Sequence, residues 1–220
     1  MNATPPIVVP ILATPFGVVP LPDAGALNSA LAALFAARMA ADASPQGNPL
    51  CYSSRDDLFE WPEEPLRLLA AAIFRGVYSV VESVNEFSGA QLREFKLEAR
   101  AWFSIVKPDG CLPAISYPNT GWCAIYCVAA PAASSTRADS GVLRLYESRF
   151  GTMFHDPTLS AMRMPYKPNH CSWRPVPGQL AVFPASLTHE IALLRSAGEL
   201  MLVTVRIRFA APGQQGIPRW

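Results

Sequence analysis

The sequence has few charged side chains, and its basic residues are not clustered. Only 16% of the 220 residues are Asp, Glu, Lys or Arg, and 18 basic residues balance 17 acidic ones. No basic block is longer than a pair. A nucleic-acid-binding surface needs clustered Lys and Arg to displace counterions from phosphates. The composition therefore argues against a nucleic-acid partner.

Two further absences concern the cellular compartment. The five cysteines include no C-x-x-C pair, and an odd number of cysteines without a signal peptide predicts reduced thiols. The first 22 residues lack a positively charged segment, and prolines interrupt each of their apolar runs. Neither a secretory signal nor a membrane span fits that pattern. We therefore expect a cytoplasmic protein with no membrane partner.

What is present is enough for one domain with a sizeable core, since half of the residues are hydrophobic. A short extended segment is expected over 7–19, where prolines permit edge pairing at best. One helix is expected over 24–41, capped by Asp23. A second is expected over 63–87, bent or split near Gly76. The residues between the two helices are expected to form a loop.

From about residue 92 the pattern changes to strands bounded by turn residues. Helices followed by a run of strands indicate an α+β protein, and the strand spacing suits a sandwich or barrel. Periodicity does not choose between these topologies. The expected strands are 95–106, 122–129, 141–147, 178–183, 190–194 and 200–209.

Four blocks of the sequence resemble those of a family of bacterial 2-oxoglutarate/Fe(II) oxygenases. Trp102-Phe103-Ser104, Gly110 and the stretch from Tyr117 to Tyr126 resemble the family's W-F-N, G-D-Y and H-x-H-P-N-S-x-W-S-G-V-Y-Y. Gly141-Val142-Leu143 with Glu147-Ser148-Arg149 resembles G-x-L-x-F-x-D-P-R. The residues from Gly178 to Glu190 resemble G-x-L-x-x-F-P-S-W-L-x-H-x-V.

The resemblance implies a double-stranded β-helix, that is, a jelly-roll or cupin-like barrel. The N-terminal helices would pack against this barrel. On this interpretation the chain is a single oxygenase-like domain: an N-terminal extended segment and helices over 1–90, the jelly-roll core over 91–210 and a tail over 211–220.

The resemblance also implies an iron site, and the sequence departs from it there. Such enzymes hold Fe(II) with two histidines and a carboxylate, or with three histidines, and leave open positions for 2-oxoglutarate and O2. The first two ligands occupy positions i and i+2 of one strand, whose side chains share a face. Ile115 and Tyr117 stand at those positions, and neither is a good Fe(II) ligand. His189 alone matches, as the distal histidine.

The sequence also departs from the family at the arginine that binds 2-oxoglutarate. The family's 2-oxoglutarate arginine lies about ten residues beyond the last histidine, where Glu199 and Leu200 stand here. Candidates for binding a carboxylate from another direction are Arg144, Arg206 and Arg208.

Other residues admit both a structural and a functional interpretation. Glu147 is either an ion-pair partner of Arg149 or a site acid. His155 and His170 are either loop residues or parts of a rearranged iron site. Cys123 and Cys127 share a strand face and are expected to be small buried hydrophobes.

Three functions follow. The favoured hypothesis is a metal-free enzyme acting on a small molecule or peptide, with acid–base work by His189, Tyr117 and Glu147. The second is an oxygenase that binds Fe(II), through His189 and other residues, together with 2-oxoglutarate. The third is a non-catalytic binding or scaffold protein whose cavity is filled by its own side chains. A homodimer through the N-terminal helices is a further hypothesis.

Overall fold

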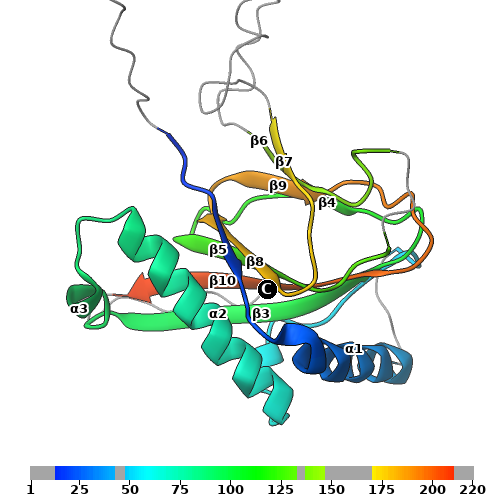
Figure 1. The fold of residues 1–220 in the computed structure, drawn as a ribbon, viewed down its shortest axis with the longest axis horizontal. Helices are drawn as coiled ribbons and strands as arrows, with labels where there is room; N and C mark the ends of the chain where they lie inside the picture. Colours follow the sequence, from blue (N-terminus) through cyan, green and yellow to red (C-terminus); the bar gives the residue numbers. More distant parts are fainter. Residues whose placement is uncertain (1–12, 43–47, 133–136, 147–169, 211–220) are drawn as a thin grey trace, which may run out of the picture.

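The computed structural model describes residues 13–42, 48–132, 137–146 and 170–210, which form two facing antiparallel β-sheets with helices on one side (Figure 1). This architecture confirms the predicted α+β jelly roll. The larger sheet has the order β1-β8-β5-β10-β3-β2, and the smaller one β4-β9-β6-β7. Their strands are β1 Gly17–Pro20, β2 Cys51–Ser53, β3 Lys96–Val106, β4 Leu112–Ile115, β5 Trp122–Ala129, β6 Leu143–Tyr146, β7 His170–Trp173, β8 Gln179–Pro184, β9 Thr188–Ile191 and β10 Leu200–Ala210.

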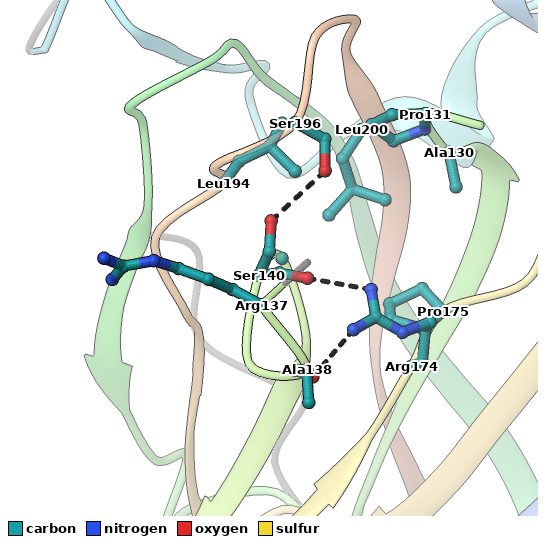
Figure 2. A pocket seen from close by; sticks show the side chains of 11 residues that line it. Ala130, Pro131, Arg137, Ala138, Ser140, Arg174, Pro175, Leu194, Ser196 and Leu200 are labelled. Carbon is teal, nitrogen blue, oxygen red and sulfur yellow. Dashed lines mark hydrogen bonds between the residues drawn. The ribbon is translucent and has the colours of Figure 1, made fainter. Parts of the chain in front are cut away.

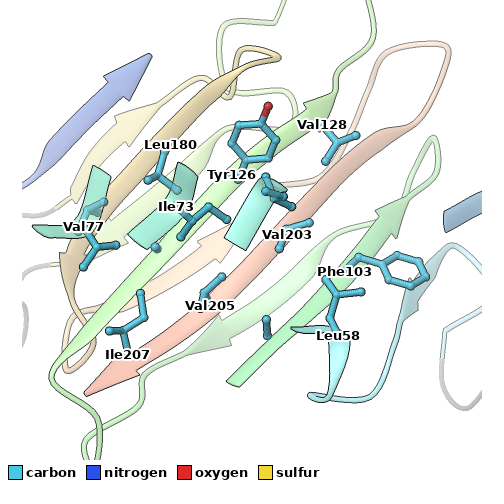
Figure 3. Packing of buried hydrophobic residues seen from close by; sticks show 14 of the residues in the cluster. Leu58, Ile73, Val77, Phe103, Tyr126, Val128, Leu180, Val203, Val205 and Ile207 are labelled. Carbon is cyan, nitrogen blue, oxygen red and sulfur yellow. The ribbon is translucent and has the colours of Figure 1, made fainter. Parts of the chain in front are cut away.

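The helices cover the outer face of the larger sheet (Figure 1). They are α1 Ala24–Ala41, α2 Glu64–Ser83, the short α3 Gly89–Leu92 and one 3-10 turn, η1 Leu58–Glu60. Apolar residues of α2 recur at helical spacing, so Ile73 and Val77 share one face and lie over the strands (Figure 3). This packing confirms that the N-terminal helices dock on the barrel.

The first helix, α1, passes for a membrane-spanning helix by length and apolar composition alone. Its Leu31 and Phe35 are nevertheless fully buried in the core between helices and sheet. The ring of Phe35 stacks on that of Phe103 in β3, with centroids 4.2 Å apart. Leu31 and Phe35, the buried residues of α1, dock one face of this helix on the sheet. The predicted cap at Asp23 is wrong, because Asp23 has φ +54° and its side chain makes no capping bond.

The predicted split near Gly76 is also wrong, because α2 runs without interruption from Glu64 to Ser83, and a bend there stays a prediction. A Cβ at Gly76 would lie 2.8 Å from Leu180 Cδ2 on β8. The glycine therefore allows the helix to approach the sheet closely. Beyond Ser83, α3 begins at a capping box formed by Ser88 and Gln91.

The longer strands β3, β5, β8 and β10 confirm the predictions for these segments to within one or two residues. The strand expected over 190–194 lies instead over Thr188–Ile191. Three short strands, β2, β4 and β7, fall in segments where the sequence predicted none.

Alternation along β10 separates two cores. Val203, Val205 and Ile207 face the helices and belong to the outer core (Figure 3). Leu202, in the inner core between the two sheets, points the other way. Thr204 and Arg206 follow it at two-residue spacing and share that inner face. The barrel interior thus becomes polar along this strand, toward its C-terminal end.

Candidate functional site

The strand pairing places the expected first and last iron-ligand positions side by side. In the antiparallel pair β4 and β9, Ile115 is the direct register partner of His189. Side chains of directly paired residues lie on the same face of a sheet. His189 is buried, at 4% exposure, whereas Ile115 is 45% exposed. The position expected for the first iron ligand therefore carries an aliphatic side chain next to a buried imidazole.

The tautomer of His189 follows from its contacts. His189 Nδ1 lies 2.9 Å from the backbone oxygen of Leu187, and because a carbonyl only accepts, Nδ1 carries the proton. His189 Nε2 then has a lone pair, and Cys123 Sγ lies 4.0 Å from it. Burial lowers the pKa of His189, partly opposed by the Leu187 carbonyl. The imidazole is therefore neutral near pH 7, with Nε2 as its acceptor atom.

Tyr117 packs its ring edge-on against His189, with ring centroids 5.6 Å apart. Trp102 of β3 closes the other side of Tyr117 at 5.8 Å. Burial raises the pKa of Tyr117, so its phenol stays protonated. Its hydroxyl makes no hydrogen bond to any residue that the structure describes. Tyr117 therefore has a donor to offer a ligand.

Arg206 is the largest fully buried side chain of the barrel, at 1% exposure. Its Nη2 donates to Asp56 Oδ2 at 3.1 Å. Its guanidinium carbon lies 5.4 Å from the ring centroid of Tyr117 and 5.8 Å from that of Trp102. Burial lowers the pKa of Arg206, and Asp56 opposes this effect. The arginine thus supports the two aromatic rings that flank the site, and Asp56 holds its charge.

Beside His189 and Tyr117 lies a cavity of about 190 Å³. Its polar lining includes the hydroxyl of Thr204, which has no side-chain partner among the described residues, and that of Ser53, which bonds Ser104 at 2.8 Å. Glu190 reaches its edge, but the Glu190 carboxylate is held by Arg144 and Tyr146. The remaining walls are mostly apolar: Trp102, Leu112, Pro113, Ile115, Ile125, Ile191 and Leu202.

The donor set does not fit the iron expected from the fold. Of the three ligand positions, Ile115 offers no donor atom and Tyr117 only a protonated phenol. Among the described residues no three His, Cys, Asp or Glu side chains come together in a way that could hold a metal ion. Cys123 Sγ is a further donor beside His189 Nε2, and burial raises the pKa of Cys123, so it is a neutral thiol.

The predicted carboxylate-binding arginines lie in three different settings. Arg206 is inside the barrel, paired with Asp56. Arg144 forms ion pairs with Asp139 and with Glu190, which is its register partner on β9. Arg144 and Glu190 lie on the face of the smaller sheet opposite to that of His189. Arg208, also on β10, is partly exposed and lies across from Glu98. A role in binding 2-oxoglutarate stays a prediction for all three.

The remaining candidates lie apart from the cavity or outside the described residues. His170 is the register partner of Tyr146, whereas His189 pairs with Leu145, so the two histidines lie on opposite faces of the smaller sheet. Glu147 and His155 fall outside the described residues. Cys123 and Cys127 are fully buried, which confirms that prediction.

The sequence did not single out Asp56, Thr204 or Trp102 as site residues. Asp56 follows a short edge strand and is 150 residues from its partner Arg206, so no local pattern connects them. Thr204 and Trp102 sit on inner positions of long strands. Their alternation was visible in the sequence, but the face that carries the site was not.

Comparison with known proteins supports the fold. No family model matches the chain, and no curated protein does. Among solved structures, a Pseudomonas putida prolyl-4-hydroxylase is 16% identical with a TM-score of 0.59, over 89% of this chain and 93% of that one. The α-ketoglutarate-dependent non-haem epimerase SnoN of nogalamycin biosynthesis is 14% identical, with a TM-score of 0.56 over 92% and 85%.

A third match is the prolyl hydroxylase of Trichoplax adhaerens in complex with a peptide fragment. It is 10% identical, with a TM-score of 0.56 over 91% of this chain and 87% of that one. Likeness at these identities establishes a fold. The chain therefore has the fold of 2-oxoglutarate-dependent oxygenases, as the sequence blocks predicted.

Proposed function

We propose that this chain is an enzyme of the oxygenase fold that acts on a small molecule in its barrel cavity without the usual iron triad. The observation that carries the proposal is the pairing of Ile115 with His189 beside the buried ring of Tyr117. It leaves one imidazole and no second strong metal ligand among the described residues at the centre of the site.

His189 suits the role of acid–base residue. Its Nδ1–H is fixed by the Leu187 carbonyl, which orients the ring and leaves Nε2 as the proton acceptor. Because burial lowers its pKa, the base is in its active form near neutral pH. Tyr117, with its phenol protonated, can donate to the oxygen of a substrate on which charge develops.

The cavity favours a small, largely apolar and uncharged ligand. Its volume of about 190 Å³ lies below the range of about 300–1,000 Å³ that is usual for drug-sized ligands. The hydroxyls of Thr204 and Tyr117 suit one carbonyl or hydroxyl group of such a ligand. An isomerisation, dehydration or cyclisation fits this set, because each moves protons without a change in oxidation state. Glu147 stays a prediction as a further acid.

Two alternatives are tested by the same measurements. A scaffold protein whose interior is filled by Ile115 and Tyr117 predicts a closed barrel, and the cavity beside His189 speaks against it. An oxygenase with rearranged ligands would need residues of 147–169, since His170 lies on the opposite sheet face from His189. The Trichoplax enzyme is bound to a peptide, and a peptide could offer this cavity only one side chain.

The deciding experiment is an anaerobic titration of the purified protein with Fe(II) and then 2-oxoglutarate, with metal content measured beforehand. The proposal expects neither stoichiometric iron nor a 2-oxoglutarate charge-transfer band. Stoichiometric iron with a band that disappears in His189→Ala would overturn it in favour of an oxygenase.

A second measurement addresses the cavity itself. Ligand-observed NMR with a library of small neutral carbonyl and hydroxyl compounds should give binders whose signal is lost in Leu112→Trp, which places an indole at the cavity wall. Leu68→Trp, on an exposed face of α2, is the matched control and should leave binding unchanged. Hits that survive Leu112→Trp would place binding elsewhere.

A further inference from the structure

A second and larger pocket, of about 340 Å³, lies at the end of the barrel where β5 ends and β6 and β10 begin (Figure 2). Four segments meet there: Ala130 and Pro131 after β5, the turn from Arg137 to Gly141, the pair Arg174 and Pro175, and the loop from Leu194 to Leu200. It shares no lining residue with the cavity at His189. The function proposed above makes no use of it.

Arg174 is held in one orientation at this pocket by backbone oxygens. Arg174 Nη1 donates to the Ser140 carbonyl at 2.9 Å and Nη2 to the Ala138 carbonyl at 2.7 Å (Figure 2). A guanidinium has five N–H donors, so three have no side-chain or backbone acceptor among the described residues. No described carboxylate pairs with Arg174, in contrast to Arg144 and Arg195 nearby. Arg174 is an exposed residue, so its guanidinium is oriented by the two carbonyls while its remaining donors are open to solvent or to a ligand.

Two buried serines add a hydroxyl donor. Ser140 Oγ accepts from the backbone N–H of Arg195 at 2.8 Å and lies 3.3 Å from Ser196 Oγ (Figure 2). Ser140 is 1% exposed and Ser196 8%. Whichever serine donates to the other, one of the two hydroxyl protons is left without an acceptor among the described residues. Buried hydroxyl groups normally donate a hydrogen bond, so an acceptor atom of a ligand would fit beside these two serines.

The lining includes a second arginine, Arg137, and is otherwise mostly apolar, with Pro131, Pro175, Leu194 and Leu200. A ligand that fits would therefore carry an anionic group at one end and a short hydrocarbon body at the other. The volume is at the small end of the usual range of about 300–1,000 Å³ for ligand pockets.

We propose that this pocket binds a small organic anion, a carboxylate or a phosphate monoester with an aliphatic body. Its acid group is held by the Arg174 guanidinium and the Ser140–Ser196 hydroxyl pair. Arginine in a fixed orientation favours such groups because it can give them two parallel, charge-assisted hydrogen bonds. Leu200 lines this pocket and Leu202 lines the barrel cavity, and the two residues lie two positions apart on β10. The anion site is therefore a neighbour of the cavity at His189, although the two share no lining residue.

The test is calorimetric titration of the full chain with butyrate, butyl phosphate and, as an uncharged match, butyramide. At least one anion should bind at least tenfold more tightly than the amide, and the comparison between the two anions identifies the acid group preferred. Arg174→Gln should weaken anion binding at least tenfold, and Ser196→Ala by a few-fold. Arg75→Gln, on the exposed side of α2, and Leu112→Trp, at the other cavity, should change nothing.

The proposal is overturned if neither anion binds better than butyramide, or if the wild type and Arg174→Gln bind equally. Because Arg174 also supports the turn at Ala138 and Ser140, its variant is checked by circular dichroism and thermal unfolding. Should Arg174→Gln fail to fold, Ser140→Ala/Ser196→Ala decides, since it removes both hydroxyl donors whichever serine donates to the other; unchanged affinity in that variant then overturns the site.

Discussion

Ile115 and His189 face each other directly across the strand pair β4 and β9. In the iron enzymes that the sequence blocks resemble, a metal ligand would occupy the position of Ile115. We propose that the backbone here keeps the frame of such a metal site and carries other side chains on it. Ligand identity, rather than barrel geometry, then accounts for the lack of fit to iron.

This relationship predicts that donors placed on the retained frame recover metal binding. In Ile115→His/Tyr117→His, two imidazoles join His189 from positions i and i+2 of the facing segment. We expect affinity for Co(II), used as a stable substitute for Fe(II), to rise at least tenfold over the wild type, with the visible spectrum of a protein-bound ion.

The control for this experiment adds His189→Ala to the double variant. If the gain depends on the frame, it should disappear there. A double variant that folds but binds Co(II) no better than the wild type would show that β4 and β9 do not hold the geometry of the site.

The pair Asp56 and Arg206 predicts a strong energetic coupling. Asp56→Asn leaves a buried guanidinium without its counter-charge, and breaking such a buried pair costs about 3–5 kcal/mol. In Asp56→Leu/Arg206→Met neither charge is left unpaired, so the loss should be clearly smaller than the sum of the single losses. Urea unfolding of the four proteins measures this.

The pair Glu64 and Arg67 on α2, with both side chains more than half exposed, is the matched control for that cycle. Exposed ion pairs contribute about 0–1 kcal/mol, so its removal should hardly change the free energy of unfolding. Additive losses at Asp56 and Arg206 would show that the two side chains do not support the barrel interior as a unit.

Docking of α1 on the sheet predicts a large loss of stability in Phe35→Ala. The ring is fully buried and stacks on Phe103, and truncating a buried Phe costs about 3–5 kcal/mol. Ala36→Ser changes an exposed position of the same helix and should cost less than about 1 kcal/mol. Equal urea midpoints for the two variants would contradict the docking of α1 on the sheet.

Much of the fold could be predicted because its longest elements carry clear patterns. The strands β3 and β10 are long, at eleven residues each, and α1 and α2 repeat apolar residues at helical spacing. The short β2, β4 and β7 have three or four residues, and β4 contains Pro113. Their pairing depends on the facing strand, so no local pattern reveals it.

The site residues likewise divide into those that the sequence revealed and those that only the tertiary structure brings together. His189, Ile115 and Tyr117 were found because they lie in blocks with a fixed spacing. The contact of His189 with Cys123 joins residues 66 positions apart on the two facing sheets, and that of Arg206 with Asp56 joins residues 150 positions apart at the larger sheet, so neither can be seen from local sequence. Cys123 was correctly assigned to the core, yet the neighbour that it meets there belongs to the tertiary structure.

The buried, neutral His189 predicts a stability that falls in acid. Burial lowers its folded-state pKa below the ordinary value of 6.5, so between these two values the unfolded chain binds more protons than the folded one. The contribution of His189 to the free energy of unfolding is therefore complete above about pH 6.5. It decreases as the pH falls from there through the folded pKa. Urea unfolding between pH 7.5 and about pH 5 should show this decrease, with a flatter profile in His189→Gln. Parallel profiles for the wild type and His189→Gln would mean that the fold does not lower the pKa of His189.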